Sequence, residues 1–116
     1  IKSESEIEFM RHAARIVEGM HQRILEKMEP GMRKCDLVAE IYDSAIRGTS
    51  DHGGDYAAIV PILPSGSDAA ASHLTWDDKP MKKDEGTFFE IAGCYRRYHV
   101  PLSRTVFLGS LPPGFS

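Results

Sequence analysis

Apolar side chains recur every three or four positions along the first part of the chain, which is the spacing that one face of an α-helix produces. The first such run follows Ser3 and Glu6, an S-x-x-E pair that caps free amide groups where a helix begins, and it ends at Pro30. This pattern predicts a helix over residues 4–27. A second run with the same spacing ends at a glycine and predicts a helix over residues 34–47.

The pattern then changes, because β-branched and aromatic residues dominate segment 85–109, as they do in β-strands. We predict two strands here, joined at residues 92–94, since Gly93 can adopt the backbone angles that a tight connection needs. A further strand is predicted at residues 56–63, with Pro61 interrupting its hydrogen bonds. Amphipathic helices followed by antiparallel strands predict an α+β fold, in which both helices pack on one sheet.

A length of 116 residues allows one domain, and 41% hydrophobic with 27% charged residues is ordinary for a globular protein. The net charge of -3, without a basic stripe, argues against a nucleic-acid partner. No apolar run is long enough to span a membrane, and the two cysteines form no C-x-x-C pair, so we expect free thiols in the cytoplasm. The chain starts without Met and stops in a loop, and we expect a fragment of a longer protein.

Glu90 is the first candidate for a functional role, because it lies in the middle of a predicted strand with apolar neighbours on both sides. An unpaired carboxylate in an apolar setting costs several kcal/mol, and a metal ion or a bound organic cation would offset that cost. The alternative is a structural ion pair across the hairpin with one of three arginines, Arg96, Arg97 or Arg104.

The order of these segments resembles a known domain. Two helices and a strand are followed by a loop of small residues that ends at His73, and the last two strands carry Ala92-Gly93 and Arg104-Thr105. This layout is similar to the first half of the pita-bread catalytic domain shared by aminopeptidase P, prolidase, methionine aminopeptidase and creatinase. The resemblance implies that the whole chain forms the amino-terminal half of such a domain, with both helices on a curved, mainly antiparallel sheet. A second half would supply further pocket residues.

The resemblance also bears on metal binding. In the metallopeptidases of this family, each of the last two strands carries an Asp ligand, and alignment on Arg104 places these positions at Glu90 and Pro101. Proline has no ligand atom, so the resemblance implies the metal-free branch that creatinase represents, and within it the ectoine hydrolases, which open a cyclic amidine by C–N cleavage. We therefore expect no cofactor, with a divalent metal (Mn, Co or Zn) at Glu90 as the alternative.

Two catalytic roles follow from the resemblance. His73 aligns with the family's active-site histidine, where it would take a proton from water and return it to the departing nitrogen. The alternative is a loop histidine bonded to a backbone carbonyl. Glu90 would hold a cationic amidine or guanidine, or would attack its carbon as a nucleophile.

Four further residues are candidates for substrate binding. His99 and Tyr98 lie where the last strand approaches the expected pocket, and the alternative for His99 is a sheet histidine bonded to a backbone group. Arg104 could clamp a substrate carboxylate, or could tie strands together by pairing with an acid. Trp76 could form a pocket wall near His73, as aromatic rings do for cations, or could lie in the core or at a dimer contact.

Together these observations predict a cytoplasmic, creatinase-like hydrolase that acts on a small molecule, with the ring of ectoine as its substrate. The first alternative is an Xaa-Pro metallopeptidase similar to aminopeptidase P or prolidase, which would need metal at Glu90. The second is a non-catalytic binding module that associates with itself to cover an exposed sheet edge. We also expect a homo-oligomer, with neither nucleic acid nor membrane as a partner.

Overall fold

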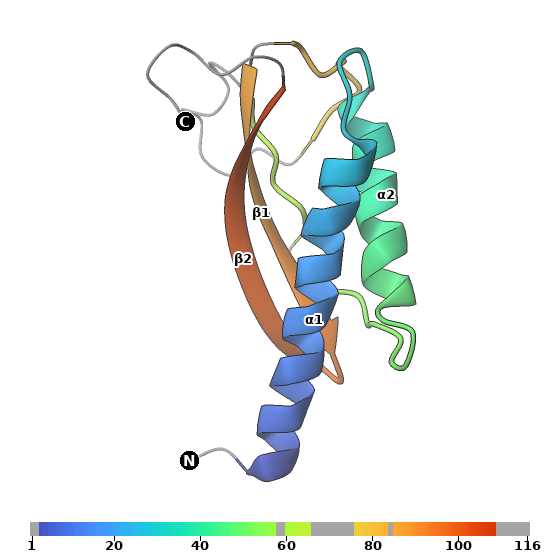
Figure 1. The fold of residues 1–116 in the computed structure, drawn as a ribbon, viewed down its shortest axis with the longest axis vertical. Helices are drawn as coiled ribbons and strands as arrows, with labels where there is room; N and C mark the ends of the chain where they lie inside the picture. Colours follow the sequence, from blue (N-terminus) through green and yellow to red (C-terminus); the bar gives the residue numbers. More distant parts are fainter. Residues whose placement is uncertain (1–2, 58–59, 66–75, 84, 109–116) are drawn as a thin grey trace.

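The computed structural model describes residues 3–57, 60–65, 76–83 and 85–108. In chain order these form four elements, helix α1 (Glu4–Lys27), helix α2 (Lys34–Arg47), strand β1 (Glu85–Tyr95) and strand β2 (Tyr98–Leu108). The strands pair antiparallel as one curved hairpin, and α1 packs against both strands and against α2 (Figure 1). Both predicted helices are confirmed at their bounds, and the α+β class is confirmed with them.

Helix α1 begins where its capping pair predicts. The hydroxyl of Ser3 accepts a hydrogen bond from the backbone N–H of Glu6 at 3.2 Å, which satisfies a free donor of the first turn. The buried face of α1 carries aliphatic residues and two histidines: His12, Ala13, Ile16, Val17, Met20, His21 and Ile24. Both histidines therefore pack in the interior of the fold.

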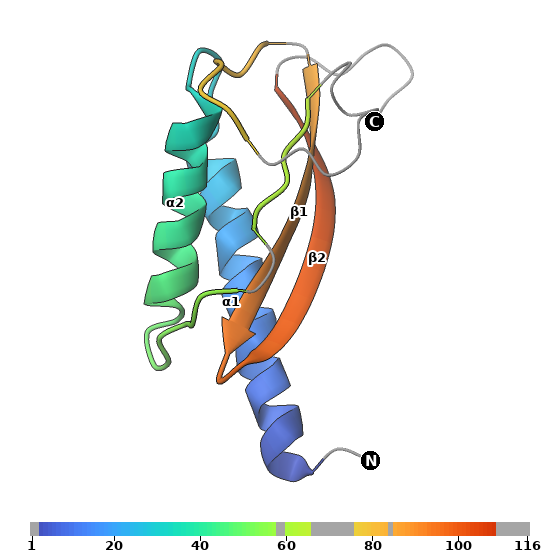
Figure 2. The same cartoon turned by 180° about the vertical axis from the view of Figure 1, so that it is seen from behind.

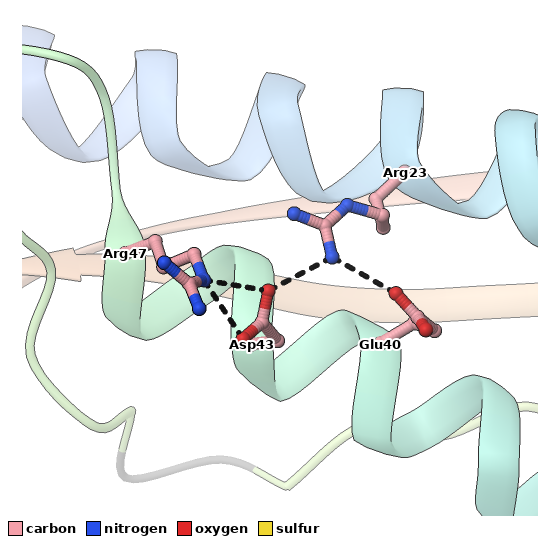
Figure 3. A network of polar contacts seen from close by, with 4 residues as sticks. All are labelled: Arg23, Glu40, Asp43 and Arg47. Atoms are coloured by element: carbon pink, nitrogen blue, oxygen red, sulfur yellow. Dashed lines mark hydrogen bonds and ion pairs between the residues drawn. The ribbon is translucent and has the colours of Figure 1, made fainter.

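Arg23 of α1 contacts two acids of α2, and one of these acids also binds Arg47 of the same helix (Figure 3). Nη1 of Arg23 donates to Oε1 of Glu40 and to Oδ2 of Asp43, both at 2.9 Å, and Nε of Arg47 donates to Asp43 at 2.9 Å. Hydrogen bonds from Arg23 and Arg47 hold the pKa of Asp43 below its ordinary value. The side chain of Arg23 thus links the two helices through ion pairs that remain partly in contact with water.

The connection between the strands is formed by Arg96 and Arg97, whose φ angles are 48° and 67°. Two successive residues with positive φ make a tight two-residue turn that matches the twist of the strands. Positive φ costs about 1–2 kcal/mol at a residue other than glycine, so contacts must hold this turn in place. The guanidinium of Arg96 lies 5.7 Å from the ring centroid of Phe9, and that of Arg97 lies 4.5 Å from the centroid of Tyr56.

The prediction of a connection at residues 92–94 is wrong, because these residues lie inside β1. Gly93 is there for a different reason. A Cβ atom at this position would meet the carbonyl oxygen of Ala13 and would lie 2.7 Å from the backbone nitrogen of Val17. Only a residue without a side chain lets β1 approach α1 so closely.

The predicted strand at residues 56–63 is only partly formed in the described residues. Backbone hydrogen bonds join Ile62 to Glu90 in both directions, at 3.0 and 3.1 Å, and a second isolated bridge to β1 follows at Ser65. Prolines in this segment lack the N–H that a continuous ladder requires. Segment 60–65 therefore runs beside β1 without forming a regular strand (Figure 2).

The core lies between the helices and one face of the hairpin. Its largest fully buried aliphatic and aromatic side chains are Phe89, Ile16, Ile24, Leu37, Ile41, Leu63 and Ile91. No helix in the described part of the chain is long and apolar enough to cross a membrane. Because the core occupies one face of the hairpin, a site on the sheet has to use the other face.

Candidate functional site

The register of the hairpin assigns each side chain to one of its two faces. Side chains of directly paired residues lie on the same face, and successive residues of a strand alternate. The inner face, which includes the buried Phe89 and Ile91, packs on the helices. The opposite face, here called the outer face, carries five pairs or rungs: Gly86 with Phe107, Phe88 with Thr105, Glu90 with Ser103, Ala92 with Pro101, and Cys94 with His99.

Glu90 lies in the middle of the outer face, with its side chain partly exposed. Within the described part of the chain, its carboxylate has no hydrogen bond and no ion pair. Arg104 pairs with Phe89 and so lies on the inner face, while the two arginines of the turn contact aromatic rings. The cross-hairpin ion pair that was the alternative for Glu90 is therefore not formed among these residues.

His99 shares the outer face with Glu90 but lies two rungs closer to the turn, a separation of about 13 Å along the strand. Its Nδ1 is 3.2 Å from the carbonyl oxygen of Arg97, which can only accept a hydrogen bond. The Sγ atom of Cys94 lies 4.0 Å from the same nitrogen, and burial raises the pKa of this thiol. His99 can contact a ligand bound at Glu90 only if that ligand spans the distance between these two rungs.

Tyr98 and Arg104 lie on the inner face, and the described structure does not bring either together with Glu90. The ring of Tyr98 packs on Phe9 of α1, with 5.7 Å between the centroids. Arg104 lines a groove of about 380 Å³ between α1 and β2, whose other walls are formed by Glu18, His21, Gln22, Leu25, Thr105 and Val106. The roles of Tyr98 and Arg104 in substrate binding remain predictions.

His21 lines the same groove and is only 5% exposed. Its Nε2 lies 3.1 Å from the carbonyl oxygen of Leu102. Burial lowers the pKa of the His21 ring, the positive charge of Arg104 adds to this effect, and the bond to Leu102 opposes it. Burial thus disfavours the charged form of the ring, and His21 packs as a structural group.

Of the other two candidates, Trp76 contacts α2, and His73 is not among the residues that the structure describes. The ring centroid of Trp76 is 6.3 Å from that of Tyr42 on α2, and Trp76 is 38% exposed. His73 falls outside the described residues, so its role as a base remains a prediction.

The residues that the structure describes do not fit a two-metal centre. No group of three or more His, Cys, Asp or Glu side chains gathers among them. The outer face offers the carboxylate of Glu90, while the neighbouring rung of Ala92 and Pro101 has no ligand atom in its side chains. A pair of metal ions requires several carboxylates, so further ligands would have to come from outside these residues.

Comparison with known proteins decides the family. The profile of metallopeptidase family M24 matches residues 8–114. The chain belongs to metallopeptidase family M24. This M24 chain is 61% identical to the ectoine hydrolase of Halomonas elongata over 120 residues, which cover 99% of the chain and 30% of that relative. The resemblance stated from the sequence is thereby confirmed.

Two solved structures show the same fold. The X-Pro aminopeptidase of Thermotoga maritima matches with a TM-score of 0.85 and 22% identity, over 97% of the M24 chain and 31% of that protein. The prolidase of Pyrococcus furiosus matches with a TM-score of 0.82 and 24% identity, over 95% of the chain and 32% of that protein. The chain thus spans about a third of the length of these relatives.

The sequence interpretation did not identify Ser103, which the structure places opposite Glu90 on the outer face. A connection at residues 92–94 would pair Glu90 with Arg96, whereas the observed turn pairs it with Ser103. The sequence signal for the true turn is weak, because such turns normally contain Asn-Gly and this one contains two arginines.

Proposed function

We propose that this chain supplies the Glu90 side of the active site of a creatinase-like hydrolase, which opens the ring of ectoine by cleaving a C–N bond. The observation that carries the proposal is the setting of Glu90. Its carboxylate has no charged partner in the described residues and lies on the outer face of a sheet whose other face packs on helices. Such an anion attracts a delocalised organic cation. The 61% identity to an ectoine hydrolase supports an amidine as that cation.

In this proposal Glu90 binds the positively charged amidine and His73 acts as the base. His73 takes a proton from water, the hydroxide adds to the amidine carbon, and the C–N bond breaks with its electron pair going to nitrogen. The proton then passes from His73 to that nitrogen. In the alternative role, the carboxylate of Glu90 attacks the amidine carbon itself, and water releases the product. His99 would support the far end of the ligand.

A chimera tests this proposal. The chain replaces the matching 30% of the Halomonas elongata ectoine hydrolase, so the rest of the domain comes from that relative. Opening of ectoine should persist in the chimera and should fall by at least about 100-fold in its Glu90→Gln and His73→Ala variants. Glu85→Gln, the same substitution at the start of β1, is the matched control. Undiminished turnover in Glu90→Gln would contradict the proposal.

A second candidate function is an Xaa-Pro metallopeptidase, which membership of a metallopeptidase family favours. It requires a divalent ion (Mn, Co or Zn) at Glu90, with its other ligands outside the described residues. The chimera separates the two functions, because turnover lost to a chelator and restored by Mn²⁺ points to a metal centre. Turnover that survives chelation points to the metal-free reaction.

A third candidate is a protein-binding module. Strand β2 has β1 on one side, and the described residues place no strand on its other side, which leaves backbone groups for a partner. We propose that the chain forms a homo-oligomer through this edge, and gel filtration over a range of concentrations tests it. A constant monomer would count against self-association. We also propose a cytoplasmic location, which the free thiols of Cys35 and Cys94 support.

A further inference from the structure

The hydrogen-bonding pattern of β1 brings one side chain of β2 next to Glu90. The N–H and carbonyl of Glu90 both bond to Ile62, at 3.0 and 3.1 Å, so they point away from β2. Glu90 and Ser103 are therefore paired without backbone hydrogen bonds between them. In such a pair the Cα atoms are about 4.5 Å apart, and the side chains come closer together than in a hydrogen-bonded pair.

Ser103 is in a position to use this proximity. It is exposed, and within the described residues neither its hydroxyl nor the carboxylate of Glu90 has a hydrogen-bond partner. The two side chains lie on the same face, and rotation about χ1 moves the serine hydroxyl among three staggered positions. On the other side of Glu90, the bridged Ile62 presents only an apolar side chain. Glu90 thus has one polar and one apolar neighbour across the sheet.

We infer that Ser103 is a positioning residue for Glu90. Its O–H donates to one carboxylate oxygen and orients the carboxylate, while the other oxygen accepts an N–H of the bound cation. The oxygen of Ser103 remains an acceptor for a second N–H of the same ligand. This pair favours a cation with two N–H groups, an amidinium or guanidinium, over a simple ammonium ion, and that preference rests on the proposed function.

The positioning role is tested in the 116-residue chain through the carbon-13 NMR signal of the Glu90 carboxylate. Ser103→Ala should shift this signal, and Ser103→Thr, which keeps the hydroxyl, should restore it. Thr105→Val removes a hydroxyl from an adjacent rung of the outer face and should leave the signal in place. A signal that does not respond to Ser103→Ala, or that moves as far in Thr105→Val, overturns the inference.

The preference for a two-nitrogen cation is tested by titrating the chimera, in which the ectoine hydrolase supplies the rest of the domain, with acetamidinium and with methylammonium. Ser103→Ala should weaken the binding of acetamidinium by about 3- to 10-fold and leave the binding of methylammonium unchanged. Equal weakening of both cations would overturn the preference. If the NMR result holds but neither cation binds the unmodified chimera, Ser103 stands as a positioning residue and the proposed role of Glu90 fails.

Discussion

The absence of a side chain at Gly93 allows β1 to lie directly against α1. Gly93→Ala should lower the free energy of unfolding by about 1–3 kcal/mol, because the added methyl group must push the strand away from the backbone of Ala13 and Val17. Urea unfolding measures this change. Gly86→Ala in the same strand is the control, since the nearest atoms to its new methyl group are 3.8 Å away. Equal losses in the two variants would show that contact with α1 is not the cause.

The turn residues carry strain that their side chains partly offset. Asn and Gly adopt positive φ more readily than Arg. Replacing Arg96 with Asn and Arg97 with Gly therefore relieves the backbone strain at both positions, which costs about 1–2 kcal/mol each. The same change removes three cation–π contacts, of Arg96 with Phe9 and Tyr95 and of Arg97 with Tyr56, worth about 0.5–1 kcal/mol each at exposed sites, and an exposed hydrogen bond from Arg97. The double variant should therefore be more stable by up to about 1 kcal/mol in thermal or urea unfolding. A less stable variant would mean that the aromatic contacts outweigh the strain.

His21 should make stability depend on pH. Its pKa is lowered on folding, so the folded chain binds a proton less readily than the unfolded chain. The contribution of His21 to the free energy of unfolding is therefore complete above the ordinary histidine pKa of about 6.5, and it decreases as the pH falls below that value. His21→Gln should show a smaller loss between about pH 7.5 and pH 5.5 in urea unfolding. An identical loss in both proteins would assign the pH dependence to other groups.

At the scale of elements, the Arg23 network joins α1 to α2. Arg23→Met should lower the thermal midpoint, whereas Arg15→Met, at an exposed position of α1 without an ion pair among the described residues, should not. The pKa of Asp43 is lowered by Arg23 and Arg47, so the network stabilises the fold above the ordinary Asp range. The difference between wild type and Arg23→Met should therefore shrink as the pH falls through the lowered pKa of Asp43. A difference that is constant down to acid pH would contradict this account.

The position of the turn is the part of the site that could not be predicted from the sequence. The helices could be predicted because capping residues and apolar spacing mark their ends locally. Glu90 could be found because a carboxylate among apolar neighbours is unusual. A turn centred at Gly93 would place Tyr98 and Arg104 on the same face as Glu90, whereas the observed turn places Ser103 there. Register alternates with period two, so a small error in the turn moves every side chain of β2 to the opposite face.

At the scale of the whole molecule, the chain spans about a third of its relatives, and the described residues offer one carboxylate on the outer face. Adding Mn²⁺ to the isolated chain should therefore leave its thermal midpoint unchanged, because one carboxylate binds a divalent ion too weakly to stabilise the fold. Differential scanning calorimetry with Mn²⁺ or with a chelator measures this. A rise of several degrees with Mn²⁺ would reveal ligands beyond the described residues.

The packing of α1 against β2 also has a consequence for synthesis on the ribosome. After α1 and α2 have been synthesised, about 60 residues must follow before β2 is complete, which takes roughly 3–12 s at typical rates of translation. Throughout that interval the apolar face of α1, including Ile16 and Val17, has no sheet to cover it. During synthesis this face is therefore exposed to aggregation or to chaperone binding until β2 emerges.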